Sequence, residues 1–99
     1  MRYRVGDTLP NLEWLSDEPL AGATVVATYA RSDGTTVSRT CALTTEVIQG
    51  RTFGVVTLDW QAGDLSVPGV GYVTLRWTGP GPEQGTLHPA AGWRVEVLP

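Results

Sequence analysis

Apolar and polar residues alternate along several short stretches of this chain, and a period of two is typical of half-buried β-strands. In residues 8–15, Leu12 and Trp14 share one face and polar residues stand between and beside them. The stretches 71–78 and 93–98 repeat the pattern, with apolar positions at Val73, Leu75, Trp77, Trp93, Val95 and Val97. The pattern predicts three strands that each bury one face.

Turn-forming residues separate further segments of this kind. Residues 23–43 are the best hairpin candidate, because strand-like runs flank the tight turn Ser32-Asp33-Gly34. Residues 53–60 predict another strand, residues 46–48 a short edge strand, and Gln49-Gly50 a turn. Glycines and prolines interrupt the windows in which a helix would need an apolar stripe of period 3.6. We therefore expect no helix.

Short strands joined by short links indicate an all-β fold. We expect a single domain over residues 1–99, an immunoglobulin-like antiparallel β-sandwich of about seven strands. The 99 residues, 41% of them hydrophobic, suffice for one core without a metal or a disulfide.

The charge of the chain argues against two classes of partner. Seven arginines, no lysine and ten acidic residues give a net charge of −3, and the arginines are scattered. Nucleic-acid binding needs a basic stripe, so we expect no nucleic-acid partner. The first residues lack the apolar segment of a signal peptide, and the longest apolar runs fall far short of the ~20 residues that cross a bilayer. We expect a soluble protein without a membrane partner.

The residue types that carry catalysis or bind metals do not fall into a productive pattern. Cys41 stands alone in a strand-like run, which favours a small buried thiol, and His88 lies far from it without a nucleophile motif. Asp7, Asp59 and Asp64 lack the close spacing of a calcium loop. We also expect Glu13 and Glu96 to lie on the polar faces of strands, apart from each other. The sequence therefore predicts no metal, no cofactor and no enzymatic activity.

Aromatic residues and turns predict structural roles instead. Trp14, Trp77 and Trp93 fall on apolar faces and should pack in the core, whereas Trp60 ends a strand and either caps the core or marks a contact surface. The alternative is a sugar-binding platform, which needs exposed coplanar rings.

Two segments provide the expected structural motif of this fold. Gly6, Asp7 and Thr8 should form a turn, and Asp64 should cap another after Gly63. Tyr72, near the start of a late strand, should hydrogen-bond back to the backbone around Asp64, as tyrosines at this place do in such sandwiches.

The order of these segments resembles the small all-β domain of bacteriophage tail and baseplate proteins of the baseplate-upper-protein type. The similar segments are Gly6-Asp7-Thr8 with Pro10, residues 19–25, Gly54-Val55-Val56, Asp64 with Pro68-Gly69 and Tyr72, and the last strand with Trp93 near its start. The chain departs from the family pattern at Leu20-Ala21, where an acidic residue is usual.

The resemblance implies a structural component of the virion in the tail, baseplate or connector region, made in the host cytoplasm and acting by contact without catalysis. Its partners would be other phage structural proteins and copies of itself, in a ring or a repeated array. A capsid decoration protein and a module that binds a host-surface glycan are the alternatives.

The N-terminus is the expected partner interface. Arg2, Tyr3 and Arg4 bring two of the seven positive charges and precede the first firm turn. We expect them to lie against a neighbouring subunit, so that deleting residues 1–4 weakens assembly more than it lowers the stability of the monomer.

Overall fold

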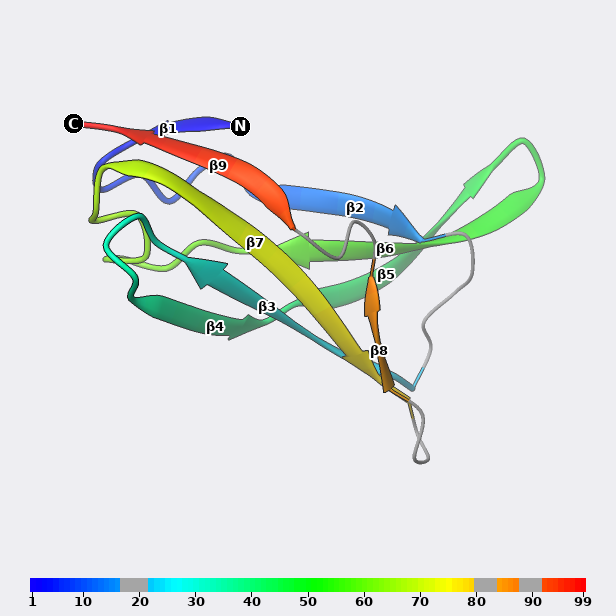
Figure 1. Ribbon diagram of the computed structural model, residues 1–99. Coiled ribbons are helices and arrows are strands. Elements are labelled where there is room, and N and C mark those ends of the chain that lie inside the picture. The colour runs from blue at the N-terminus through cyan, green and yellow to red at the C-terminus, as the bar shows by residue number, and fades with distance from the viewer. Residues whose placement is uncertain (17–21, 80–83, 88–91) are drawn as a thin grey trace.

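Two β-sheets pack face to face in the computed structural model, which describes residues 1–16, 22–79, 84–87 and 92–99 (Figure 1). The described residues form nine strands and no helix. The strands are β1 (Arg2–Arg4), β2 (Leu12–Ser16), β3 (Thr24–Ala30), β4 (Thr36–Thr40), β5 (Ala42–Ile48), β6 (Arg51–Leu58), β7 (Gly69–Thr78), β8 (Gln84–Leu87) and β9 (Trp93–Leu98). The all-β prediction is confirmed, but the strand count exceeds the expected seven.

The larger sheet has the strand order β1-β9-β7-β3-β4. Its central strand β7 is ten residues long, and along one side it pairs first with β9 and then with β8. The smaller sheet has the order β2-β6-β5. One pairing departs from the expected antiparallel pattern, because β1 runs parallel to β9 with Tyr3 opposite Val97.

The predicted hairpin over residues 23–43 is confirmed for β3 and β4, which pair from Val26–Thr40 to Ala30–Thr36. The second expected strand, however, is broken at Cys41. There the backbone N–H of Cys41 donates to the carbonyl of Val25 at 2.8 Å, and the chain leaves the larger sheet to begin β5 in the smaller one. Alternation alone does not reveal such a crossing, because the residues on both sides continue to favour a strand.

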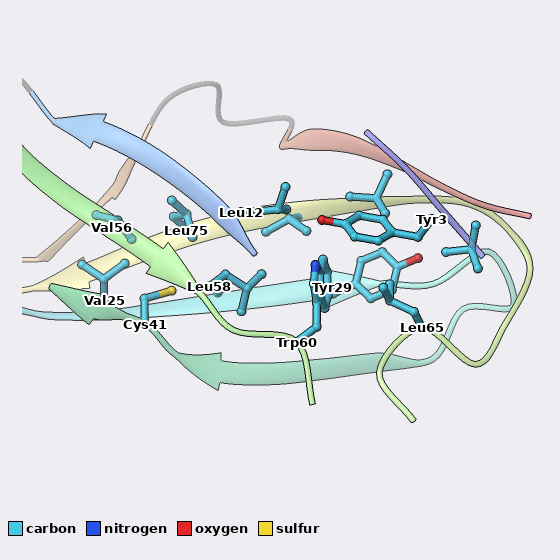
Figure 2. Packing of buried hydrophobic residues seen from close by; sticks show 14 residues of the cluster. Tyr3, Leu12, Val25, Tyr29, Cys41, Val56, Leu58, Trp60, Leu65 and Leu75 are labelled. Atoms are coloured by element: carbon cyan, nitrogen blue, oxygen red, sulfur yellow. The ribbon is translucent and has the colours of Figure 1, made fainter. Parts of the chain in front are cut away.

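The core lies between the sheets, and three rings fill one end of it (Figure 2). Trp60 makes edge contacts with Tyr3 at 5.7 Å and with Tyr29 at 5.2 Å between ring centroids. Aliphatic side chains fill the rest, among them Leu12, Val25, Val56, Leu58, Leu65, Val73, Leu75, Val95 and Val97. Because Trp60 is 4% exposed, it is a core residue and not a contact surface.

Candidate interaction surfaces

The N-terminal strand β1 contributes one side chain to the core and two to the surface. The side chain of Tyr3 is 3% exposed, and its hydroxyl donates to the carbonyl of Pro10 at 2.7 Å. Burial raises the pKa of this hydroxyl. The prediction that Tyr3 offers its side chain to a partner is therefore wrong, because the alternation of β1 turns it inward. Arg2 and Arg4 do lie exposed on the outer face, where contact with a neighbour stays a prediction.

The turn predicted at Gly6, Asp7 and Thr8 is present. The Asp7 carboxylate accepts the backbone N–H of Arg4 at 2.8 Å, and the Asp7 N–H donates to the Arg4 carbonyl at 3.1 Å. Gly6 has φ 89°, a left-handed conformation that side chains rarely adopt, and its N–H donates to the carbonyl of Leu65 at 3.0 Å. Thr8 is exposed. The turn thus ties the N-terminus to the segment around residues 61–65.

Asp64 does more than cap a turn. Its carboxylate accepts the N–H of Gln61 at 2.9 Å, as a turn cap should, and it also pairs in two-pronged fashion with Arg39, from Nη2 at 2.6 Å and Nε at 3.0 Å. Burial by itself raises the pKa of Asp64, but the hydrogen bonds from Arg39 and Gln61 outweigh it and hold the pKa below the ordinary value. The sequence showed the cap but not the arginine 25 residues away.

Tyr72 does not perform the predicted corner role. It lies on the outer face of β7 and is 47% exposed, so its ring points away from the core and from the buried Asp64. The predicted alternation on β7 is correct, and it is this alternation that places Tyr72 outside: the inward neighbours Gly71 and Val73 are buried.

Four arginines share the outer face of the larger sheet with Tyr72. Arg94 lies opposite Tyr72 in the register of β7 and β9, and Glu96 bridges Arg94 at 3.1 Å and Arg2 at 3.5 Å. The exposed side chains of Arg4 and Arg76 belong to the same face. The five charges sum to +3 while the whole chain carries −3, so the remainder of the chain carries −6. The face favours anionic partners.

The tryptophans do not form a sugar platform. Trp14 of β2 packs on Trp93 of β9 across the two sheets, with centroids 4.9 Å apart and planes inclined by 47°. Trp77 is also partly buried against the core. The core-packing prediction is confirmed for these three rings.

The single cysteine lies where the sequence predicted. Cys41 is buried, and burial raises its pKa to about 11. A thiol of this kind is protonated at neutral pH, whereas nucleophilic cysteines are thiolates.

Acidic side chains do not converge. Glu13 lies on the outer face of the smaller sheet and Glu96 on the outer face of the larger one, so the two carboxylates belong to opposite sides of the sandwich. Among the described residues no group of three or more His, Cys, Asp or Glu is placed to hold a metal ion. His88 lies outside the described residues. No helix in the described part of the chain is long and apolar enough to cross a membrane.

The sequence predicted a short edge strand over residues 46–48, which lies within β5, but it did not predict that this segment projects from the body. Strands β5 and β6 continue past the end of β2 as a two-stranded arm, defined here as residues 45–53, which projects from the body (Figure 1). Val47 is 66% exposed and Ile48 38% exposed. The turn Gln49-Gly50, which the sequence predicted, closes the arm with φ values of 51° and 77°. Two positive φ values in a two-residue loop are the type I′ geometry that suits hairpins.

Comparisons with protein-family models, with curated proteins and with solved structures give no match for this chain. The surfaces described above are therefore the basis for inferring its function.

Proposed function

We propose that this chain is a structural domain that acts by protein–protein contact, without catalysis, in the tail, baseplate or connector region of a bacteriophage particle. The arm of residues 45–53 is the observation that carries the proposal. Its residues 45–52 are exposed, and among them Val47 and Ile48 present apolar side chains that are 66% and 38% exposed. An isolated two-stranded hairpin is marginally stable in water, so such an arm gains from a partner that covers it.

We also propose that the domain is an immunoglobulin-like β-sandwich. The order β2-β6-β5 in one sheet corresponds to strands B, E and D of an immunoglobulin-like sandwich. The order β9-β7-β3-β4 in the other corresponds to G, F, C and C′. This correspondence supports an immunoglobulin-like domain, and the resemblance of the sequence to phage tail and baseplate domains points to its place in a virion.

Incorporation into particles tests the proposal. Particles of the source phage are purified, probed with an antibody against the domain and viewed by electron microscopy. We expect label at the tail or baseplate; label over the capsid would indicate the decoration alternative. A domain that is abundant in the lysate and absent from purified particles would refute a virion role.

A matched pair of variants tests whether the arm makes the contact. Val47→Asp places a charge on the arm, and Leu9→Asp places one on the loop before β2, where Leu9 is 69% exposed. Both sites are so exposed that neither change should disturb folding. We expect Leu9→Asp to enter particles like the wild type and Val47→Asp to be excluded. Equal incorporation of the two variants would show that the arm is not the contact.

A host-surface glycan remains a second candidate, favoured by one observation. The exposed ring of Tyr72 stands opposite Arg94 on a face of net charge +3. An aromatic face with adjacent arginines suits an acidic sugar. Glycan-array binding that Tyr72→Ala abolishes and Arg51→Ala leaves unchanged would support this function; no binding to any acidic glycan would exclude it.

A further inference from the structure

Strand β5 is the least protected sheet edge among the described strands. It spans seven residues with a single charge, Glu46, and contains neither proline nor glycine. The other terminal strands are shorter: β1 has three residues, two of them arginine, β8 has four, and β2 and β4 have five each. Natural proteins protect exposed edges with short strands, charges, prolines or bulges, because an open edge pairs with other strands. The length and composition of β5 therefore favour pairing of its free edge with a strand of another chain.

The sequence of β5 is complementary to itself when reversed. From Ala42 to Ile48 it reads apolar, apolar, polar, polar, polar, apolar, apolar. If two copies overlap over the whole strand in antiparallel direction, Ala42 faces Ile48 and Leu43 faces Val47. Thr44 then faces Glu46, and Thr45 faces itself. Apolar side chains meet apolar ones, and no like charges stand opposite each other.

Neighbouring registers lack this match. A shift centred on Glu46 places two carboxylates opposite each other, and a shift centred on Thr44 sets Glu46 against Ala42. Register follows the pattern of side chains, so the full overlap is favoured over both alternatives.

The backbone groups of β5 suit the same register. Ile48 and Arg51 flank the two-residue turn and form the first hydrogen-bonded pair of the hairpin. Hydrogen-bonded and non-hydrogen-bonded pairs alternate along an antiparallel ladder, so the backbone N–H and C=O groups of Ile48, Glu46, Thr44 and Ala42 point to β6. Those of Leu43, Thr45 and Val47 point to the free edge. In the full overlap these three face one another: Leu43 meets Val47 of the second copy, and Thr45 meets Thr45.

We propose that two copies of this chain associate through β5, antiparallel and about a two-fold axis at Thr45, which joins the two small sheets into one sheet of six strands. The proposal rests on the contact role proposed above and names its partner, a second copy. Because β5 continues past the end of β2 into the arm, the bodies of the two copies lie at opposite ends of the shared ribbon. A short strand pair buries little area, so we expect a dissociation constant on the order of micromolar.

Thr45→Pro tests the main-chain pairing. Proline removes the N–H that points to the free edge and leaves the ladder between β5 and β6 intact, whereas Thr45→Val keeps the N–H and serves as the control. Sedimentation equilibrium should show a wild-type dimer, a dissociation constant raised about tenfold or more in Thr45→Pro, and little change in Thr45→Val. Val47→Glu, at an exposed site that leaves folding intact, should weaken the dimer as strongly, because it places a carboxylate opposite Leu43.

Cysteine cross-linking tests the register. Thr44 and Glu46 form a pair without mutual backbone hydrogen bonds, in which the side chains lie closest. Mild oxidation of mixed Thr44→Cys and Glu46→Cys proteins should give a disulfide-linked dimer, and the mixture of Thr44→Cys with Ile48→Cys should give far less. The wild type should give none, because its own Cys41 is buried.

The outcomes separate this proposal from the one above. A wild-type protein that is monomeric at hundreds of micromolar, or a dimer that Thr45→Pro and Val47→Glu leave unchanged, would overturn β5 pairing. Incorporation into particles in that case would leave the virion role intact, with another protein covering the arm. A β5 dimer of a protein absent from particles would leave the pairing intact and refute the virion role.

Discussion

The ion pair between Asp64 and Arg39 makes the sharpest stability prediction. The Asp64 side chain is 2% exposed and accepts three hydrogen bonds, two from Arg39 and one from the N–H of Gln61. In Asp64→Asn the amide oxygen keeps the bond from Gln61, but its NH₂ group turns a donor toward the guanidinium. The same oxygen also accepts the bond from Nε of Arg39, so the variant removes the charge and the bond from Nη2 of Arg39 while it leaves the shape of the turn.

The magnitude follows from how each partner is buried. Breaking a fully buried ion pair costs about 3–5 kcal/mol, because the remaining charge stays unpaired. The Arg39 side chain is 37% exposed, so its guanidinium can turn toward water and the cost falls. We expect Asp64→Asn to lower the free energy of unfolding by about 2 kcal/mol. For a domain of 99 residues this corresponds to a fall in Tm of roughly 8–16 °C.

The pH dependence provides a second, independent measurement. The pKa of Asp64 is lowered in the folded protein, so its contribution is present above the unfolded pKa of about 4 and is lost as the pH falls through the folded value. Urea unfolding of wild type and variant should therefore give a constant difference from pH 8 to pH 5, which shrinks toward pH 2.

Two results would refute the predicted role of the Asp64–Arg39 ion pair. A stability difference below about 0.5 kcal/mol at pH 7, or a larger difference that persists unchanged to pH 2, would show that the ionic contact contributes little. The double variant Asp64→Asn with Arg39→Met serves as the control. It should be no less stable than Asp64→Asn alone, because the partner of the removed arginine charge is already gone.

Four further changes test the core. The Tyr29 hydroxyl is buried without a partner in the described structure, so Tyr29→Phe should leave the free energy of unfolding unchanged or raise it by up to about 1 kcal/mol. Tyr3→Phe loses the bond to Pro10 and should lower the free energy of unfolding by about 1 kcal/mol. Urea titration measures both, and a Tyr3→Phe protein more stable than Tyr29→Phe would contradict the assignment. Deleting residues 1–4 removes β1 and the ring of Tyr3, so we now expect a loss of about 3 kcal/mol or more in monomer stability, contrary to the sequence-based expectation, and an unchanged Tm would refute it. Gly71→Ala should cost about 1–3 kcal/mol, because the added Cβ would lie 2.6 Å from the Tyr29 ring and against the carbonyl of Ala30; a wild-type Tm would mean that the strand yields freely.

The local pattern of the chain was enough to predict much of the secondary structure. Period-two alternation placed β7 and β9 and chose their buried faces, because a strand that rests on a core must alternate. Turn chemistry placed Ser32-Asp33-Gly34 and Gln49-Gly50, because few residues adopt positive φ without strain. The buried state of Cys41 followed from the same reasoning.

Features that depend on segments distant in sequence were beyond that pattern. The residues near Arg39 do not predict its ion pair with Asp64. The residues near Tyr3 do not predict the parallel pairing of β1 with β9, which places the Tyr3 ring in the core. The predicted role of Tyr72 was wrong for the same reason. Its position near the start of a late strand is typical of a tyrosine corner, but the alternation of β7 places its side chain on the solvent-exposed face.

The sequence by itself therefore determined most of the strands, several turns and the all-β class of the fold, because these properties depend on neighbours a few positions apart; it did not predict β1 and β8. The sequence predicted an edge strand over residues 46–48, but only the tertiary structure decided that the strand after Cys41 changes sheets, that the open edge spans the whole of β5, and that the arm extends past β2. The physical reason is that the extent of an edge and the position of a crossing depend on which distant strands lie beside a segment, and the local pattern of side chains does not specify those neighbours.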